Sequence, residues 1–136
     1  MARILVVDDE PMMLDLLHIT LTRKGHAVLK ADRGRQAIQL FRQDHPDLTI
    51  LDLNLPDITG IDVLREIRSV EPHTPVIILT GAGREDMKNQ ARELGVTDFL
   101  QKGFSLHELG AALNRVLKQP GQADPSSSGP KTPRTR

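Results

Sequence analysis

Three aspartates and one threonine in this chain each follow a short apolar run. The runs and the polar residues after them are 4–7 with Asp8 and Asp9, 48–51 with Asp52, and 76–79 with Thr80. Each run has the length and the aliphatic content of a strand that is buried on both faces of a parallel sheet. Because ligands of an open parallel sheet bind beyond the carboxyl ends of its strands, the three carboxylates and the hydroxyl are expected to share one site.

Carboxylates that converge in this way repel one another. The repulsion is about 4 kcal/mol per pair at roughly 4 Å and an effective dielectric constant near 20, so the cluster persists only if it is protonated or neutralised. An all-oxygen site suits Mg²⁺, which prefers one or two carboxylates, a phosphate oxygen and several waters. The chain has no cysteine, and its five histidines are scattered through predicted helices and loops, which argues against zinc.

The same groups are suited to phosphoryl transfer. A bound metal ion would screen a carboxylate, so that one of its oxygens can attack phosphorus in line. Thr80 and Lys102 both come at the ends of predicted strands. They would offer a hydroxyl and a fixed cation to the equatorial oxygens of the transferred group.

Helical patterns alternate with strands along the chain. We predict strands over 4–7, 27–31, 48–51, 76–79 and 99–100. Helices are predicted from Pro11 to Lys24, after a cap at Asp32, around 61–70, over 85–94, and over 106–117 after a capping box of Ser105 and Glu108. Five β-α units with right-handed crossovers place helices on both faces of a parallel sheet. The expected fold class is α/β, a flavodoxin-like doubly wound (βα)5 fold with a parallel five-stranded sheet of order 2-1-3-4-5, the order being inferred from the fold class.

The composition indicates one globular domain. The 136 residues include 18 basic and 18 acidic ones, so no overall charge favours direct nucleic acid binding or an anionic membrane. No apolar stretch approaches the roughly 20 residues of a membrane span, and no signal-peptide pattern is present, so a cytoplasmic location is expected. Residues 119–136 hold four of the nine prolines and no large apolar side chain. We therefore predict a domain over 1–118 and a disordered Pro/Ser-rich tail or linker stump over 119–136.

The order and spacing of these residues resemble the receiver domains of two-component response regulators, over roughly residues 2–118. The resemblance is carried by Asp8-Asp9 after the first strand, Asp52 in the run D-L-N-L-P-D-I-T-G, Thr80, and Lys102 after D-F-L-Q. The chain departs from the family pattern at Gly103, where proline is usual after the lysine, and at Gly81, where alanine is usual.

The resemblance implies a role for each acidic residue. Asp52 would be the phosphoacceptor, which becomes a 4-aspartylphosphate. Asp9, Asp52 and the backbone carbonyl of Asn54 would bind Mg²⁺, and Asp8 would hold a metal-bound water.

The resemblance also implies how the signal is passed on. Thr80 and Lys102 would bind the phosphoryl group, and Phe99 would be the aromatic residue that moves with Thr80. A sensor histidine kinase or a phosphotransfer protein would be the donor. The chain would not be an enzyme in the usual sense, since it would catalyse only its own phosphorylation and dephosphorylation. The surface of the fourth helix, fifth strand and fifth helix would control a downstream protein partner or a missing output domain, and a weak phosphorylation-dependent dimer is compatible with this scheme.

Other interpretations remain open at this level. A Mg²⁺-dependent phosphohydrolase with Asp52 as transient nucleophile often has a second aspartate two residues on, as general acid. Asn54 stands there, and an amide cannot donate and accept a proton in turn. A pseudo-receiver that binds partners without phosphorylation is disfavoured because every acidic residue is in place. Taken singly, Asp8 and Asp9 could be turn or cap residues, and Lys102 an ordinary surface lysine.

Overall fold

The computed structural model describes residues 1–81 and 85–117. The chain divides into two units, Met1–Phe104 and Ser105–Arg136. The tail predicted over 119–136 lies outside the described residues.

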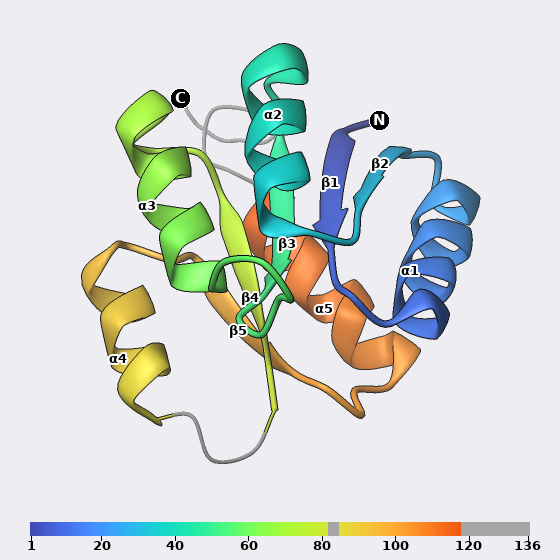
Figure 1. Cartoon of the computed structure of the whole chain (residues 1–136). Helices are drawn as coiled ribbons and strands as arrows, with labels where there is room; N and C mark the ends of the chain where they lie inside the picture. Colours follow the sequence, from blue (N-terminus) through green and yellow to red (C-terminus); the bar gives the residue numbers. More distant parts are fainter. Residues whose placement is uncertain (82–84, 118–136) are drawn as a thin grey trace, which may run out of the picture. The chain divides into compact units, whose positions relative to one another are not determined.

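Strands and helices alternate along the chain, as Figure 1 shows. The strands are β1 (Arg3–Val7), β2 (Ala27–Ala31), β3 (Leu48–Asp52), β4 (Val76–Thr80) and β5 (Asp98–Gln101). The helices are α1 (Pro11–Arg23), α2 (Gly34–Asp44), α3 (Gly60–Val70), α4 (Glu85–Glu93) and α5 (Leu106–Leu117). The predicted elements are thus confirmed in kind and order, with boundaries that differ by a few residues.

The five strands form one parallel sheet in the order β2-β1-β3-β4-β5, which confirms the predicted fold class. Val7 of β1 pairs with Leu51 of β3, and Asp52 pairs with Leu79 of β4. The carboxyl ends of these three strands therefore lie side by side at one edge of the sheet. This is the edge at which the sequence analysis predicted the three aspartates and Thr80.

The larger buried cluster lies between the sheet and the helices α2, α3 and α4. It combines alternate strand residues, such as Leu5, Leu51 and Ile78, with Phe41 of α2 and Leu64 of α3. Successive side chains of a strand point to opposite faces, so the residues between these point to the other face. Helix α1 contacts β1 and β2, and its buried Leu17 and Leu21 are not part of this cluster.

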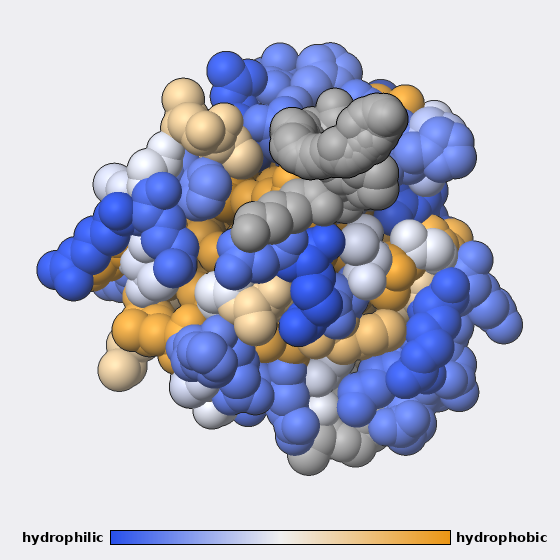
Figure 2. All heavy atoms as spheres, turned by 180° about the vertical axis from the view of Figure 1, so that it is seen from behind, coloured by the Kyte–Doolittle hydropathy of each residue, from blue (hydrophilic) through white to orange (hydrophobic). Residues whose placement is uncertain are grey.

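Polar side chains are frequent on one face of the molecule. Figure 2 shows hydrophilic side chains over most of the face that is seen from behind. Within the described residues, no helix combines the length and the apolar character that crossing a membrane requires.

The second unit contains α5, which begins with a capping box. The Glu108 amide donates to Ser105 Oγ at 3.0 Å, and the Ser105 amide donates to Glu108 Oε1 at 2.8 Å. This reciprocal pair confirms the predicted start of the helix.

The cap of α2 corrects a prediction. The sequence pointed to Asp32, but the N-cap position is Arg33, which makes no side-chain capping bond. The amides of Gly34 and Arg35 donate instead to the Asp57 carboxylate, at 2.8 and 3.0 Å, from the loop after β3. The prediction of Asp32 was wrong because the carboxylate that accepts these amides belongs to Asp57, which is 23 positions from Gly34 in the sequence. The loop that follows Asp52 is therefore tied to α2.

Removing this cap is expected to destabilise the protein. Burial acts to raise the pKa of Asp57, but the backbone N–H groups of Arg35 and Gly34 outweigh it, and the pKa falls from 3.8 to about 2. Because the pKa is lower in the folded state, the stabilisation is present above pH 3.8 and is lost as the pH falls through about 2. Asp57→Ala should lower the free energy of unfolding near neutral pH by about 1 to 2 kcal/mol in urea titrations.

The matched control is Asp32→Ala, which removes an exposed aspartate that the structure does not use as a cap. This variant should unfold almost as the wild type does, and its stability should retain the wild-type pH dependence between pH 4 and 2, whereas that of Asp57→Ala should be flatter. Equal losses in the two variants would contradict the assignment of the cap.

Thr49 places an unpaired hydroxyl in the interior of the sheet. The residue is fully buried, and its Oγ1 has no hydrogen-bond partner among the described residues. It pairs in register with Leu5 and Val76, which both belong to the larger buried cluster. Valine has nearly the same shape and no polar atom to desolvate. Thr49→Val is therefore expected to raise the free energy of unfolding by about 1 kcal/mol.

Thr97→Val is the control for this substitution, since the Thr97 hydroxyl accepts a hydrogen bond from the Val76 amide at 3.2 Å. The same chemical change should here lower the free energy of unfolding by about 1 kcal/mol, because it leaves a backbone donor unpaired. If Thr49→Val were as destabilising as Thr97→Val in urea titrations, the Thr49 hydroxyl would have a bonding partner.

Candidate functional site

Three carboxylates meet at the carboxyl ends of β1 and β3. Asp8 and Asp9 follow β1, and Asp52 is the last residue of β3. One oxygen from each lies within 4.8 Å of the others. Asp8 and Asp52 are buried, and Asp9 is exposed. The geometry meets the expectation that these three carboxylates share one site.

The Asp8 carboxylate is destabilised by its burial. Burial raises its pKa to about 6, helped by the neighbouring charge of Asp52, while the Glu10 amide and Lys102 act in the opposite direction. Its Oδ1 accepts the Glu10 amide at 2.9 Å. Its Oδ2 is fully buried, and although the Lys102 ammonium is 3.0 Å away, no hydrogen bond of good geometry reaches this oxygen. Asp8 therefore offers a buried acceptor oxygen that no hydrogen bond from the described residues satisfies.

Lys102 is the cation of the site. Its Nζ lies 3.0 Å from Asp8 Oδ2, 3.0 Å from Asp52 Oδ2 and 2.5 Å from Glu10 Oε1. Burial acts to lower the pKa of Lys102, but the three carboxylate partners outweigh it and raise the pKa above its ordinary value. The ammonium therefore stays charged at neutral pH and offsets part of the acidic charge.

The backbone holds this lysine at the end of β5. The Lys102 amide donates to the Thr80 carbonyl at 2.8 Å, which continues the pairing of β4 with β5. Gly103 follows with a φ of +94°, a left-handed conformation that glycine adopts without strain. Glycine thus makes the turn where the family usually has proline.

Asp52 is positioned by the loop that follows it. Its Oδ1 accepts the Asn54 amide at 3.2 Å, and the Gly60 amide donates to the Leu53 carbonyl at 2.8 Å. A Cβ on Gly60 would lie 2.4 Å from the Asp52 carbonyl oxygen, so the start of α3 packs directly on the backbone of the site.

The residues present fit a hard divalent cation such as Mg²⁺. The cluster offers only oxygen ligands, and the buried Asp8 Oδ2 lacks a hydrogen bond. In the scheme that the resemblance implies, Asp9, Asp52 and the Asn54 carbonyl would hold the ion, and Asp8 would act through a water. When bound, the ion would screen the carboxylates and the negative charge of a phosphoryl group.

Thr80 and Phe99 occupy the face of the sheet that carries α4. Thr80 is buried at the end of β4, and Ile78, two residues earlier, pairs in register with Phe99. The side chains of Thr80 and Phe99 therefore point to the same face of the sheet, the face to which Ile78 also points. The Phe99 ring is partly buried and lies 5.0 Å from the Arg92 guanidinium of α4. The structure thus places Phe99 against α4.

Sequence reasoning missed Glu10 and the tight packing of Gly60. Glu10 is the third acid in the run D-D-E, which was a usable signal. Its contact with Lys102 spans 92 positions, and no local pattern predicts such a pairing.

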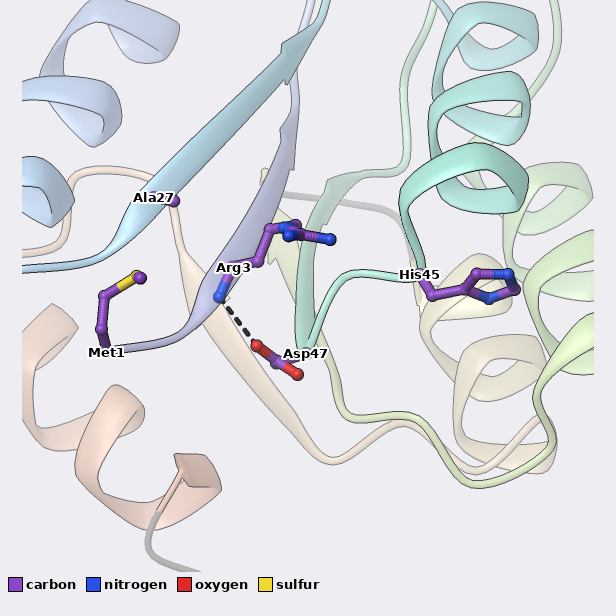
Figure 3. A pocket seen from close by; sticks show the side chains of 5 residues that line it. All are labelled: Met1, Arg3, Ala27, His45 and Asp47. Atoms are coloured by element: carbon purple, nitrogen blue, oxygen red, sulfur yellow. Dashed lines mark hydrogen bonds between the residues drawn. The ribbon is translucent and has the colours of Figure 1, made fainter.

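A pocket at the opposite edge of the sheet does not belong to this site. It is lined by Met1, Arg3, Ala27, His45 and Asp47 (Figure 3). These residues lie near the amino ends of β1, β2 and β3. The Arg3 amide donates to Asp47 Oδ2 at 2.8 Å, and the His45 ring points away from the other residues (Figure 3).

Comparisons with known proteins agree with this geometry. The family model of the response regulator receiver domain matches residues 4–114. The alkaline phosphatase synthesis transcriptional regulatory protein PhoP of Bacillus subtilis is 37% identical over 125 residues, which are 92% of this chain and 52% of that protein. The chemotaxis protein CheY of Thermotoga maritima is 32% identical over 117 residues, which are 85% of this chain and 98% of that protein.

A solved structure is similar as well. A receiver domain protein from Clostridium thermocellum superposes with a TM-score of 0.81 at 34% identity, covering 86% of this chain and 94% of that one. The chain spans about half the length of the first curated relatives it matches, 52% and 50%.

Proposed function

Because the chain belongs to the response regulator receiver domain family, we propose that Asp52 receives a phosphoryl group and that this modification switches the protein between two states. The observation that carries the proposal is the surrounding of Asp52. A buried carboxylate lies 3.0 Å from a lysine ammonium, and two further aspartates offer oxygens within 4.8 Å. This arrangement provides a nucleophile, a fixed cation and a metal site in one place.

The donor would be the phosphohistidine of a sensor histidine kinase or of a phosphotransfer protein. An Asp52 oxygen attacks phosphorus, a P–O bond forms, and the P–N bond breaks. The departing histidine nitrogen keeps the electron pair. The Lys102 ammonium and the Thr80 hydroxyl bind the oxygens of the phosphoryl group. The chain then acts only on itself, in its phosphorylation and its later dephosphorylation by water, and it does so in the cytoplasm.

The signal would leave through α4, β5 and α5. A phosphoryl group adds about 1.5 to 2 negative charges, and a new acceptor near Thr80 would draw its hydroxyl inward and make room for Phe99. Helix α4 buries only Met87 and Ala91 among its residues, which suits an element that shifts at low cost. A downstream protein or an output domain would read the changed surface, and a weak dimer of phosphorylated chains is a further outcome. Neither nucleic acid nor membrane is bound by this domain directly.

Acetyl phosphate with Mg²⁺ tests the proposal. Intact-mass measurement should show one added phosphoryl group that is lost on standing. Beryllofluoride with Mg²⁺ should then shift amide signals both near Asp52 and along α4. Absence of any adduct would favour a pseudo-receiver, and shifts confined to the metal pocket would exclude the switch. Multiple-turnover hydrolysis of a phosphomonoester would instead favour the phosphohydrolase.

A further inference from the structure

The proposed function requires Lys102 to bind a phosphoryl oxygen, but its ammonium is already hydrogen-bonded to Glu10 and Asp52 and lies 3.0 Å from Asp8 Oδ2. A lysine ammonium has three N–H donors. Three carboxylate oxygens surround it, from Glu10 at 2.5 Å and from Asp8 and Asp52 at 3.0 Å each. An incoming phosphoryl oxygen must therefore compete with these carboxylates for the ammonium.

Glu10 is the partner that can leave. The side chains of Asp8 and Asp52 are 0% and 3% exposed, whereas that of Glu10 is 60% exposed. The two aspartates are also held by backbone amides, Asp8 by that of Glu10 and Asp52 by that of Asn54. A released Glu10 carboxylate would enter water, while a released aspartate would remain as a buried and unpaired charge.

The backbone of Glu10 keeps its charge close to the site after release. Glu10 is the N-cap residue of α1, and Pro11 occupies the first helical position. Its amide donates to Asp8 Oδ1 at 2.9 Å. The carboxylate can therefore move only by rotation of its own side chain, and it continues to repel a nearby dianion.

We propose that Glu10 occupies the phosphoryl-binding position on Lys102 in the unmodified protein and acts as a built-in competitor of phosphorylation. This inference rests on the proposed function and adds an autoinhibitory residue to it. Glu10 is outside the cluster that could hold the metal ion, since that cluster consists of Asp8, Asp9 and Asp52. Its removal therefore leaves the proposed nucleophile and metal ligands intact.

Glu10→Gln tests the inference, since glutamine keeps the shape and an acceptor oxygen but loses the charge. Affinity for beryllofluoride is measured at saturating Mg²⁺ from amide shifts, and the rate of modification by acetyl phosphate from intact mass. Binding should become about fivefold tighter and modification about fivefold faster, the effect of roughly 1 kcal/mol from an exposed charge pair. The differences in affinity and in rate between Glu10→Gln and the wild type should shrink at about 1 M salt, because the Debye length is then near 3 Å and the charge of Glu10 is screened.

Asp15→Asn is the matched control, because it removes the same charge from an exposed position of α1. Asp15→Asn should change the affinity for beryllofluoride and the rate of modification by acetyl phosphate much less than Glu10→Gln does. Equal affinity in Glu10→Gln and wild type would overturn the inference and leave the proposed function standing. Weaker binding would also overturn it, because Glu10 would then hold Lys102 in place. If neither protein formed an adduct, the proposed function would fail and the inference with it.

Discussion

Asp52→Asn should abolish phosphorylation by acetyl phosphate. An amide oxygen cannot form the acyl phosphate, so the rate should fall by roughly a thousandfold or more, to below detection by intact mass. Asparagine fills the same space and can still accept a hydrogen bond from Lys102, which lies 3.0 Å from Asp52 Oδ2. The fold should therefore survive the substitution, and a normal urea unfolding transition would verify this.

Peptide mapping of the phosphorylated wild-type protein should identify the modified residue. The label should be found only on the peptide that contains Asp52, and Asp15→Asn, with its exposed position on α1, should be modified at the wild-type rate. A fully labelled Asp52→Asn protein would place the phosphoacceptor elsewhere, and the proposed function of the strand-end cluster would have to be abandoned.

Gly60→Ala should cause a large loss of stability. The added Cβ would lie 2.4 Å from the Asp52 carbonyl oxygen and 2.6 Å from Leu53 Cα. Both neighbours belong to the backbone, so neither can turn aside as a flexible side chain would. We expect the free energy of unfolding to fall by about 3 kcal/mol in urea titrations. Because the clash bears on Asp52 itself, modification by acetyl phosphate should also slow.

Gly81→Ala provides the comparison for this substitution. Among the described residues, a Cβ at Gly81 would meet no atom within 4 Å, and Gly81 does not need a positive φ. Its stability should stay within about 0.5 kcal/mol of the wild type. If Gly60→Ala also stayed within that range, the loop after β3 would be free to move away, and close packing would not be what positions Asp52.

Asp52→Asn and Gly60→Ala probe different properties of Asp52, its chemistry and its position. Asp52→Asn removes the chemistry and keeps the packing, whereas Gly60→Ala keeps the chemistry and disturbs the packing. Together they separate the loss of a nucleophile from the loss of its position. The Asp57 cap contributes to the same positioning, because it ties the loop after Asp52 to α2 at 2.8 and 3.0 Å.

The amino-acid sequence by itself determined the elements and the edge at which the site lies. Apolar runs of strand length and helical spacing of apolar residues are local patterns, and they reflect burial directly. Strand-end residues such as Asp8, Asp52 and Thr80 could be assigned to one edge because all strands of a parallel sheet end on the same side. The order of the strands came only with the fold class, and the structure confirms it.

The tertiary structure alone decided which side chains pair within that frame. Asp57 replaces Asp32 as the cap of α2, Glu10 accepts a hydrogen bond from Lys102, and Gly60 packs on the Asp52 carbonyl. These contacts join residues far apart in the chain, up to 92 positions, and depend on loop paths and side-chain rotation at the level of single ångströms. Periodicity and propensity report whether a residue is buried or exposed, but they carry no information on which distant group it meets.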